Sequence, residues 1–212
     1  MSEQAQTEQL IKKTAKKIFF HKGFLDATTQ EIADEAGVNR ALIHYYFRSR
    51  EQLLDTIIEE SILEKKEKVR AILTSSLPFR EKIAQYIDMM IDRGIEYPFI
   101  ENFLISEMAR KPDQMKFFCT MDKIKSSDLI KKDLEEEIAQ GRVAPVTAQH
   151  FMINLSSMCA YPVLAKPIFQ MVHGMSDNDY KKFLLDRKQV IYTALFNEPL
   201  PKKKVKSITK ND

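Results

Sequence analysis

The side chains best suited to chemistry in this sequence lie close together near its N-terminus. A guanidinium fork, a methyl group, an imidazole and a phenol come from Arg40, Ala41, His44 and Tyr45. Such groups can bind base edges, thymine methyl groups or phosphate oxygens. At helical spacing they share the outward side of one short helix, while Ile43 faces inward. The pattern therefore indicates a surface that contacts nucleic acid.

Neighbouring elements must hold this short helix, and the sequence predicts a helix-turn-helix. Thr28 to Glu31 has the form of a capping box and begins a helix that Gly37 ends. Asn39 is a suitable N-cap for the next helix, which runs to about Tyr46. The small Ala33 lets the two helices approach, and Gly37 permits a positive φ in the turn. A small helical hairpin with solvated polar residues is the alternative interpretation.

The rest of the chain also has helical periodicity and no strand alternation. Only 5 glycines occur in 212 residues, which disfavours Gly-rich phosphate loops and β architectures with many turns. We expect an all-α fold of about nine helices, three short and six longer. They are predicted near Glu8–Lys22, Thr28–Ala36, Asn39–Tyr46, Ser49–Leu73, Phe79–Glu96, Phe99–Arg110, Asp113–Gln140 and Thr147–Val172, with a last one that starts at Ser176.

Composition and charge narrow the class of protein. With 44% apolar and 30% charged residues, the chain can form a core. No apolar run approaches the ~18 residues that a membrane span needs, and the N-terminus lacks the apolar stretch of a signal peptide. We therefore expect a cytoplasmic protein without membrane contact. Most of the net charge of +3 comes from five lysines in the tail 201–212, so nucleic-acid binding must be argued from the local motif.

Further residues extend the helix-turn-helix signature on both sides. In chain order they are Gly23-Phe24, Thr28-Thr29, Ile32-Ala33, Ala36-Gly37-Val38, Ile43, Tyr46-Phe47, Ser49-Arg50-Glu51 and Leu53. Over about residues 8–60 they resemble the N-terminal domain of the TetR family of bacterial transcriptional regulators, whose approximate pattern is TT-x2-IA-x2-AGVS-x-G-x-LY-x-YF-x-SKE-x-L. The chain departs from that pattern at four positions, where the family's Ser, Gly, Tyr and Lys are replaced by Asn39, Ala41, His44 and Arg50.

The resemblance implies a homodimeric, ligand-responsive repressor that binds a palindromic operator in double-stranded DNA. It implies a DNA-binding domain over 1–48, a ligand-binding and dimerisation domain over 49–200, and a basic, disordered tail over 201–212. By position it implies phosphate contacts from Thr28, Thr29, Tyr46 and Arg50. It implies base contacts from Arg40, Ala41 and Tyr45, and Asn39 and His44 complete the predicted DNA-binding set.

Methionines and aromatic residues concentrate in the larger domain. Nine of the 10 methionines lie between Met89 and Met175. Methionine adapts to irregular volumes and is frequent at promiscuous binding surfaces, although it also fills ordinary cores. Together with the resemblance, this composition predicts a pocket for a mainly apolar small molecule. The predicted lining is Tyr86, Met89, Phe103, Phe117, Met152 and Tyr161.

The last helix carries an apolar stripe that predicts a dimer interface beside the helix Thr147–Val172. Its members are Phe183, Leu184, Val190, Ile191 and Leu195. The alternative is that the stripe faces the core of its own subunit. Pro162 and Pro167 each remove a backbone donor, so they should kink or break the helix before it.

Other kinds of site find little support. The two cysteines, Cys119 and Cys159, cannot form a disulfide framework or a four-ligand zinc site by themselves. No Ser/His/Asp, Cys/His or Gly-rich catalytic signature occurs, so we predict no catalytic residue, no cofactor and no metal. An enzyme is therefore disfavoured. The alternative to a regulator is a helical binding or scaffold protein that keeps the fold without binding an operator.

Overall fold

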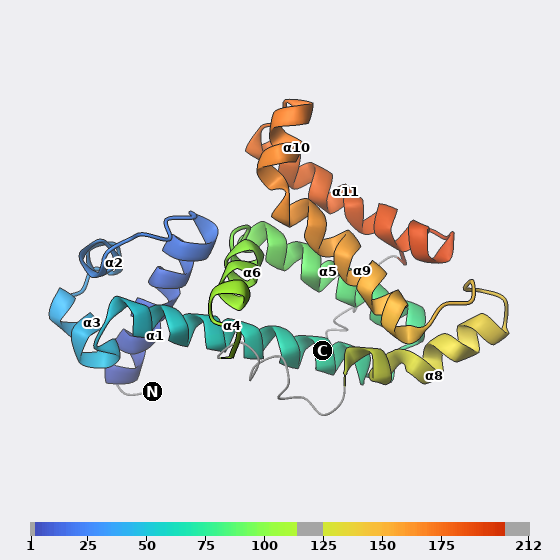
Figure 1. Ribbon diagram of the computed structural model, residues 1–212, viewed down its shortest axis with the longest axis horizontal. Coiled ribbons are helices and arrows are strands. Elements are labelled where there is room, and N and C mark those ends of the chain that lie inside the picture. Colours follow the sequence, from blue (N-terminus) through green and yellow to red (C-terminus); the bar gives the residue numbers. More distant parts are fainter. Residues whose placement is uncertain (1–2, 114–124, 202–212) are drawn as a thin grey trace, which may run out of the picture.

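The computed structural model describes residues 3–113 and 125–201, and every regular element in these ranges is a helix. This confirms the all-α prediction. Among the described residues, no helix combines the length and apolar character that crossing a membrane requires. The elements in chain order (Figure 1) are α1 Glu3–Lys16, a π-helical turn η1 Lys17–His21, α2 Thr29–Ala36, α3 Arg40–Phe47, α4 Arg50–Leu73, α5 Phe79–Glu96, α6 Ile100–Arg110, α8 Ser126–Ala139, α9 Ala148–Leu164, α10 Lys166–His173 and α11 Asp177–Phe196.

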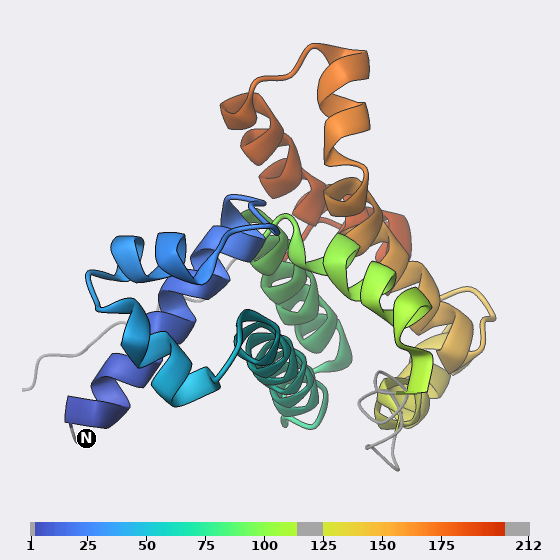
Figure 2. The same cartoon turned by 60° about the vertical axis from the view of Figure 1, so that its left-hand side comes forward.

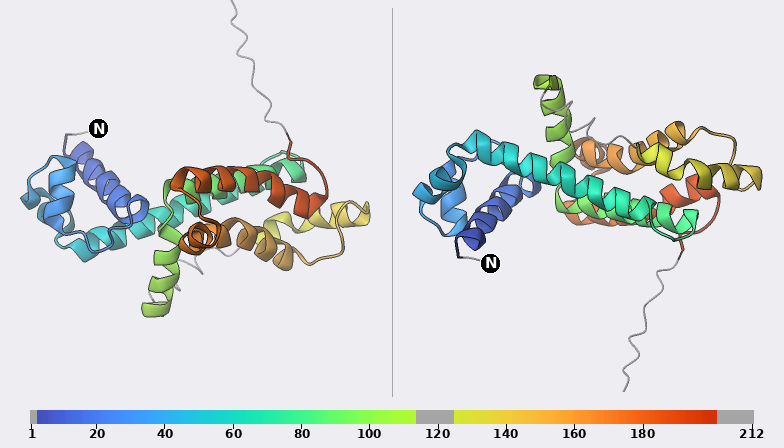
Figure 3. Two further views of the ribbon diagram at one scale, coloured as in Figure 1. Left: turned by 90° about the horizontal axis from the view of Figure 1, so that it is seen from above. Right: turned by 90° about the horizontal axis from the view of Figure 1, so that it is seen from below.

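The helices form an elongated molecule. In Figure 1, α1, α2 and α3 gather at one end, and α4 runs from this group below α5, α6 and α9 towards α8. The turned view in Figure 2 keeps the three N-terminal helices together on one side of α4. From above and below, Figure 3 shows α4 beneath the other helices along the long axis of the body. We call α1, η1, α2 and α3 the head, and α5, α8, α9 and α11 the body.

Local capping explains where the helices of the head begin. The Thr28 hydroxyl accepts from the Glu31 N–H at 3.2 Å, and the Thr28 N–H donates to Glu31 Oε2 at 2.7 Å, a complete capping box. Gly37 ends α2 with φ of 67°, in the left-handed region that glycine adopts without strain. Asn39 then caps α3 by accepting from the Ala41 N–H at 2.8 Å. Ser49 starts α4 in the same way through Gln52.

Two of the predicted long helices are wrong as continuous elements. The helix expected over Thr147–Val172 is divided at Ala165 into α9 and α10. Pro167 removes no helical hydrogen bond there, because it lies in the first turn of α10, where backbone N–H groups have no partner within the helix. The helix expected over 113–140 is interrupted at Lys125, since Asp113 is helical and α8 begins at Ser126. Lys125 before it is extended, and its N–H donates to Asp128 Oδ2 at 2.9 Å.

The first predicted helix needs correction in its bounds, whereas the last helix is capped by Ser176, where it is predicted to start. The helix near Glu8–Lys22 begins earlier, at Glu3, and its last turn is the π-helical η1. The final helix begins at Asp177, after Ser176 forms a capping box with Asp179. With α9 and α10 separate, the described residues contain ten α-helices, which agrees with the expectation of about nine.

Two apolar cores hold these helices. The body core joins the end of α4 to α5, α8, α9 and α11, and includes Leu73, Ile83, Ile87, Ile91, Ile130, Leu155 and Ile191. Gly94 allows α5 to approach α9 closely, since a Cβ there would lie 2.5 Å from Val163 Cγ2. The head core joins α1, η1, α2, α3 and the start of α4. It also includes Ile100 and Leu104 from α6.

The head is fixed to α6 by polar contacts as well as by apolar ones. The Phe99 N–H donates to the Phe20 carbonyl at 3.1 Å, and His21 Nδ1 donates to the Glu96 carbonyl at 2.7 Å. The Phe20 and Phe103 rings lie 5.7 Å apart between centroids. The head is therefore connected to the rest of the chain in two ways. It continues covalently into α4, and it packs against α6.

Lysines of α1 form ion pairs with α4. Lys12 Nζ lies 2.5 Å from Glu60 Oε1, and Lys16 Nζ lies 3.0 Å from Glu64 Oε2. Glu64 also accepts from Lys68 at 2.7 Å. The hydrogen bonds from Lys68 and then Lys16 lower the pKa of Glu64 to about 2. Lys12 and Lys16 thus join α1 to α4 within the protein.

We expect Glu64 to make stability depend on acid pH. Because its folded pKa is about 2 and its unfolded pKa is near ~4.3, ionised Glu64 stabilises the fold above the unfolded value, and this contribution disappears as the pH falls towards 2. Glu64→Gln should therefore reduce the loss of unfolding free energy between pH ~5 and pH ~2. Urea unfolding at several pH values measures this, with the exposed Glu135→Gln as control. An unchanged pH dependence in Glu64→Gln would contradict the assignment.

Candidate nucleic-acid interface and effector cleft

The outward side of α3 is exposed, as the sequence predicts. Ile43 and Phe47 anchor the helix in the head core. Tyr45 is 69% exposed and packs edge-on against the Tyr46 ring at 5.1 Å. Ala41 and His44 are exposed beside it. The helix therefore offers a methyl group, an imidazole and a phenol on one accessible face.

This face continues into a concavity of about 610 Å³ between the starts of α2 and α4 and the length of α3. Arg40 is oriented within it, because its Nε donates to Thr29 Oγ1 at 3.1 Å. The structure thus brings together six of the nine predicted DNA-binding residues. The full lining is Thr29, Asn39, Arg40, Ala41, Ile43, His44, Arg48, Ser49 and Arg50.

Three predicted DNA-binding residues lie outside this lining. Thr28 is exposed directly before α2, where its side chain forms the capping box. Tyr45 projects from α3 into solvent. Tyr46 is half-buried and packs against the head core, with its ring 6.2 Å from that of Phe47. Its position therefore fits support of α3 as well as a phosphate contact by its hydroxyl group.

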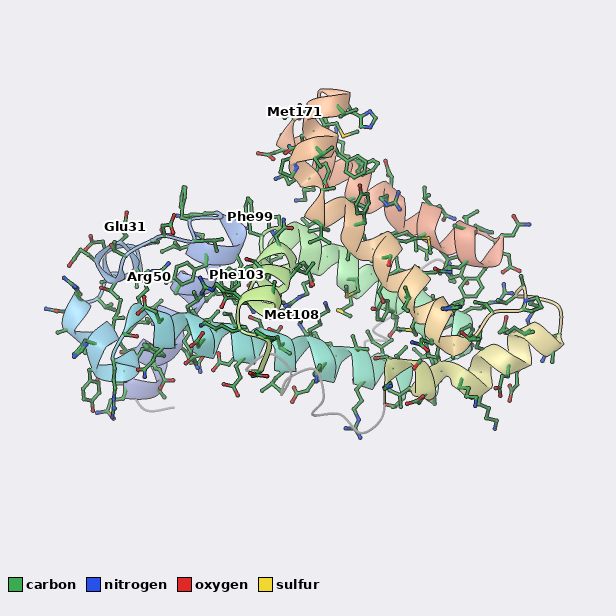
Figure 4. All side chains as sticks on the ribbon, in the orientation of Figure 1. Glu31, Arg50, Phe99, Phe103, Met108 and Met171 are labelled. Carbon is green, nitrogen blue, oxygen red and sulfur yellow. The ribbon has the colours of Figure 1, made fainter. Side chains whose placement is uncertain are left out.

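Arg50 makes hydrogen bonds within the protein that the sequence did not indicate. Its Nε donates to the Ala27 carbonyl at 2.7 Å, and its Nη2 donates to the Leu25 carbonyl. The guanidinium also lies over the Phe19 ring, 5.4 Å from the centroid. Arg50 therefore ties the segment before α2 to the start of α4 (labelled in Figure 4 with Glu31), and its donors are directed to carbonyl groups.

Arg48 is a residue of this face that sequence reasoning missed. It follows α3 with φ of 59°, is exposed, and lines the same concavity. Positive φ is uncommon in arginine, so the turn between α3 and α4 imposes this backbone conformation. The sequence feature that could have identified Arg48 is its position, a cationic residue directly after the predicted recognition helix.

A larger cleft of about 1190 Å³ lies between α4, α5, α6, α8 and α9. Tyr86 of α5 and Met152 of α9 line it, as predicted. The complete lining is Ile62, Leu63, Lys65, Lys66, Glu67, Val69, Arg70, Thr74, Tyr86, Glu101, Leu104, Ile105, Met108, Lys125, Ser126, Ser127, Leu129, Gln149, Met152, Ile153, Ser156 and Ser157.

The other predicted pocket residues lie elsewhere. Met89 packs against the body core, and Phe103 packs with Phe20 against the head core, near Phe99 in Figure 4. Tyr161 is exposed and contacts Phe169 at 6.0 Å. Phe117 lies outside the described residues. The methionine-rich composition did not distinguish the cleft from the two cores, because methionine is common both in apolar cores and at binding surfaces.

The cleft lining is mostly apolar, as expected, but it also carries charged groups. Six lysine, arginine and glutamate side chains line it beside its apolar residues. Burial raises the pKa of the Tyr86 hydroxyl to about 12, so it stays protonated, and it lies 3.3 Å from Ser156 Oγ. The cleft therefore combines an apolar wall with neutral hydroxyl groups and charged groups.

The described residues contain neither a thiolate-prone cysteine nor a cluster of metal-ligating side chains. Burial raises the pKa of the Cys159 thiol to about 12, which disfavours the reactive thiolate. Within residues 3–113 and 125–201, no three His, Cys, Asp or Glu side chains are placed to hold a metal ion. Cys119 lies outside these ranges.

The predicted dimer stripe on α11 divides between two environments. Leu184 and Ile191 are buried in the body core of their own subunit, and Phe183 and Leu195 pack against it. Val190 alone of the five is exposed. The exposed apolar side chains continue instead onto α10, where Met171 (Figure 4) is 83% exposed beside Ile168 and Val172.

Comparison with known proteins identifies the N-terminal elements. Residues 11–57 match the family model for bacterial regulatory proteins of the tetR family. Over this segment the chain is similar to the TetR family. This segment contains α2, α3 and the start of α4, hence the whole helix-turn-helix. The matched segment therefore includes the helix-turn-helix of a bacterial transcriptional regulator.

Relatives and a solved structure agree with this assignment. The chain is 27% identical over 145 residues to the uncharacterized HTH-type transcriptional regulator YhgD of Bacillus subtilis, covering 65% of this chain and 72% of YhgD. It is 40% identical over 68 residues to the HTH-type transcriptional regulator BetI of Agrobacterium fabrum, 32% of each protein. A putative transcriptional regulator from Saccharomonospora viridis, solved in complex with choline, shares the fold with a TM-score of 0.61 at 17% identity, over 86% of this chain and 95% of that one.

We expect Arg40→Ala to weaken specific DNA binding without unfolding the protein. Arg40 is exposed and its single side-chain partner in the described residues is Thr29. Loss of a base contact should cost roughly 1–3 kcal/mol of specific binding, while the unfolding free energy should change by less than ~0.5 kcal/mol. Titration of an operator fragment and urea unfolding measure the two quantities. Unchanged operator affinity would remove Arg40 from the recognition face.

In contrast to Arg40→Ala, Arg50→Gln should lower the stability of the fold. The substitution removes the charged donors that hold the Leu25 and Ala27 carbonyls. Hydrogen bonds to charged groups contribute about 1.5–3 kcal/mol, so we expect the unfolding free energy to fall by ~2 kcal/mol. Urea unfolding gives this value directly. If Arg50→Gln is as stable as the parent chain but loses DNA binding, Arg50 acts mainly on phosphate instead.

Proposed function

We propose that this chain is a cytoplasmic TetR-family repressor that binds a palindromic operator as a homodimer and leaves it when a small molecule binds. The observation that carries the proposal is the exposed face of α3, with Arg40 held by Thr29 and the α3 anchors Ile43 and Phe47 buried beneath it. Residues 1–48 are proposed as the DNA-binding domain, residues 49–200 as the domain for effector and partner, and residues 201–212 as a basic tail.

The contacts proposed with DNA follow from this face. Arg40, Ala41 and Tyr45 would meet base edges in the major groove, because they project from the exposed side of α3. Thr28 and Thr29 lie at the N-terminus of α2, where backbone N–H groups and the helix dipole favour phosphate. Arg48 adds a cation at the end of α3. Phosphate contacts of this kind would fix the register, and the base contacts would give sequence preference.

A homodimer is proposed because one recognition helix provides few base contacts. Dimeric helix-turn-helix proteins contact two half-sites about 34–36 Å apart, which mirrors the palindrome in the operator. The exposed apolar side chains of α10 and α11 are the proposed contact surface, namely Ile168, Met171, Val172, Leu185 and Val190. Their exposure in a single chain is the support for this choice, because a second copy would remove them from water.

The cleft between α4, α6 and α9 is proposed as the effector site. The fold neighbour from Saccharomonospora viridis binds choline, which supports a small-molecule site in a protein of this shape. Leu104 and Ile62 line the cleft and also contact the head core. An effector there can change operator affinity by its differential binding to two head positions. The expected coupling is about 1–3 kcal/mol, or roughly 5–150-fold in affinity.

A mobility shift tests DNA binding directly. The full chain should retard the DNA flanking its own gene at concentrations that leave an unrelated fragment of equal length free. Unlabelled flanking DNA should compete, whereas unrelated DNA should not. Equal retardation of both fragments at physiological salt would contradict the operator and would favour a scaffold protein that retains the fold.

Aspartate at the exposed apolar surface should separate the subunits. Met171→Asp and Val190→Asp place a charge where the partner would pack, so we expect monomers by light scattering and a loss of operator binding with the helical circular dichroism unchanged. Leu184→Asp is the contrasting variant, because Leu184 is buried in its own subunit and the charge should unfold the body. Dimers that persist in both surface variants would exclude this interface.

A further inference from the structure

We propose that the cleft between α4, α6 and α9 binds an amphipathic anion, a molecule with one anionic headgroup and an apolar chain. This inference rests on the proposed function, since it specifies the chemical class of the effector. The support is the separation of the lining into an apolar part and a cationic part. It adds one anionic headgroup to the mainly apolar effector that the sequence predicts.

The apolar part of the lining is long enough for an alkyl chain. Leu104, Ile105 and Met108 come from α6, and Met152 and Ile153 come from α9. Ile105, Met108 and Ile153 are exposed to solvent in the chain as it stands. Covering each buried methylene of a ligand contributes about 0.8 kcal/mol, so contact with these side chains would favour binding. A cleft of about 1190 Å³ has room for such a chain and its headgroup.

The charged part of the lining has an excess of cations. Lys65, Arg70 and Lys125 face two glutamates among the described lining residues, Glu67 and Glu101. Two of these three cations, Lys65 and Arg70, lie on α4. The local field therefore favours a negative headgroup near α4.

The less exposed of the two glutamates is already neutralised. Glu101 Oε1 lies 2.9 Å from Lys65 Nζ and 3.9 Å from Arg93 Nε, and the Glu101 side chain is only 17% exposed. Arg93 Nε is buried and has no hydrogen-bond partner in the described structure. Two cations thus share one carboxylate oxygen. A cationic ligand would have to compete with them for Glu101, whereas an anionic ligand would find Lys65 partly accessible.

Binding of this kind would also reach the contact between α4 and α6. Lys65 lies on α4 and Glu101 on α6, so a headgroup that draws Lys65 away from Glu101 weakens their ion pair. The apolar chain would meanwhile pack against Leu104, which belongs to the head core. The headgroup and the chain would therefore act on the same helix, α6, from two directions.

The experiment compares two amphiphiles of equal chain length and opposite charge. Decanoate and decyltrimethylammonium are titrated into the full chain by isothermal calorimetry, below their critical micelle concentrations. We expect decanoate to bind, and decyltrimethylammonium to bind at least tenfold more weakly. Arg70→Gln and Lys65→Gln should each weaken decanoate roughly tenfold, as expected for loss of one charge-assisted contact.

Lys68→Gln is the matched control. Lys68 lies on the same helix and carries the same charge, but it pairs with Glu64 and is outside the cleft lining. Decanoate affinity should stay within twofold of the parent in this variant. Arg70 is exposed, so its variant tests the idea even if loss of the Lys65–Glu101 pair unfolds the protein.

Several results would overturn the inference. These are no binding of decanoate, equal or tighter binding of decyltrimethylammonium, or equal loss in Lys68→Gln and Arg70→Gln. The proposed function fails in a different experiment. If decanoate binds as described but does not release operator DNA in the mobility shift, the cleft is an anion site and the repressor mechanism is wrong.

Discussion

The position of α6 constrains the rest of this structure. Ile100 and Leu104 of α6 are buried in the head core with residues of α1, η1 and α3. Leu104 and its neighbours Ile105 and Met108 also line the large cleft. One helix therefore completes the core of the head and forms a wall of the cleft that we propose as the effector site. Full burial of one such leucine stabilises a fold by about 1.5–3 kcal/mol, so the head cannot leave α6 without a substantial loss.

This shared helix gives a physical basis for communication between the two sites. The head is attached to the body covalently through α4 and by packing through α6, with Phe99 and Phe20 joined by a backbone hydrogen bond. A ligand that moves α6 relative to α4 must move the head or break that packing, because closely packed cores do not deform continuously. The ion pairs of Lys12 and Lys16 with α4 hold α1 to the same rigid helix.

Local signals in the sequence were sufficient for the elements of the recognition face. The N-caps at Thr28, Asn39 and Ser49 depend on hydrogen bonds within three residues, so a short motif specifies them. The inward direction of Ile43 follows from helical period alone. For the same reason the all-α class was predictable from periodicity and low glycine content.

Features that depend on tertiary packing were not predictable in this way. Phe103 and Met89 are of the residue types that commonly line apolar pockets. In the fold, however, Phe103 packs against Phe20, and Met89 packs against the body core. Leu184 and Ile191 lie on an apolar stripe whose direction is decided by α5 and α9, distant in sequence. Arg50 matched a motif position, and only the fold reveals that its donors meet the Leu25 and Ala27 carbonyls.

Differential scanning calorimetry of the full chain tests the shared core most directly. If Ile100 and Leu104 are part of the head core, the head cannot melt while the body remains folded. The account then predicts one cooperative transition at fixed protein concentration. Two resolved transitions, with the head melting first and α6 retained in a folded body, would contradict it.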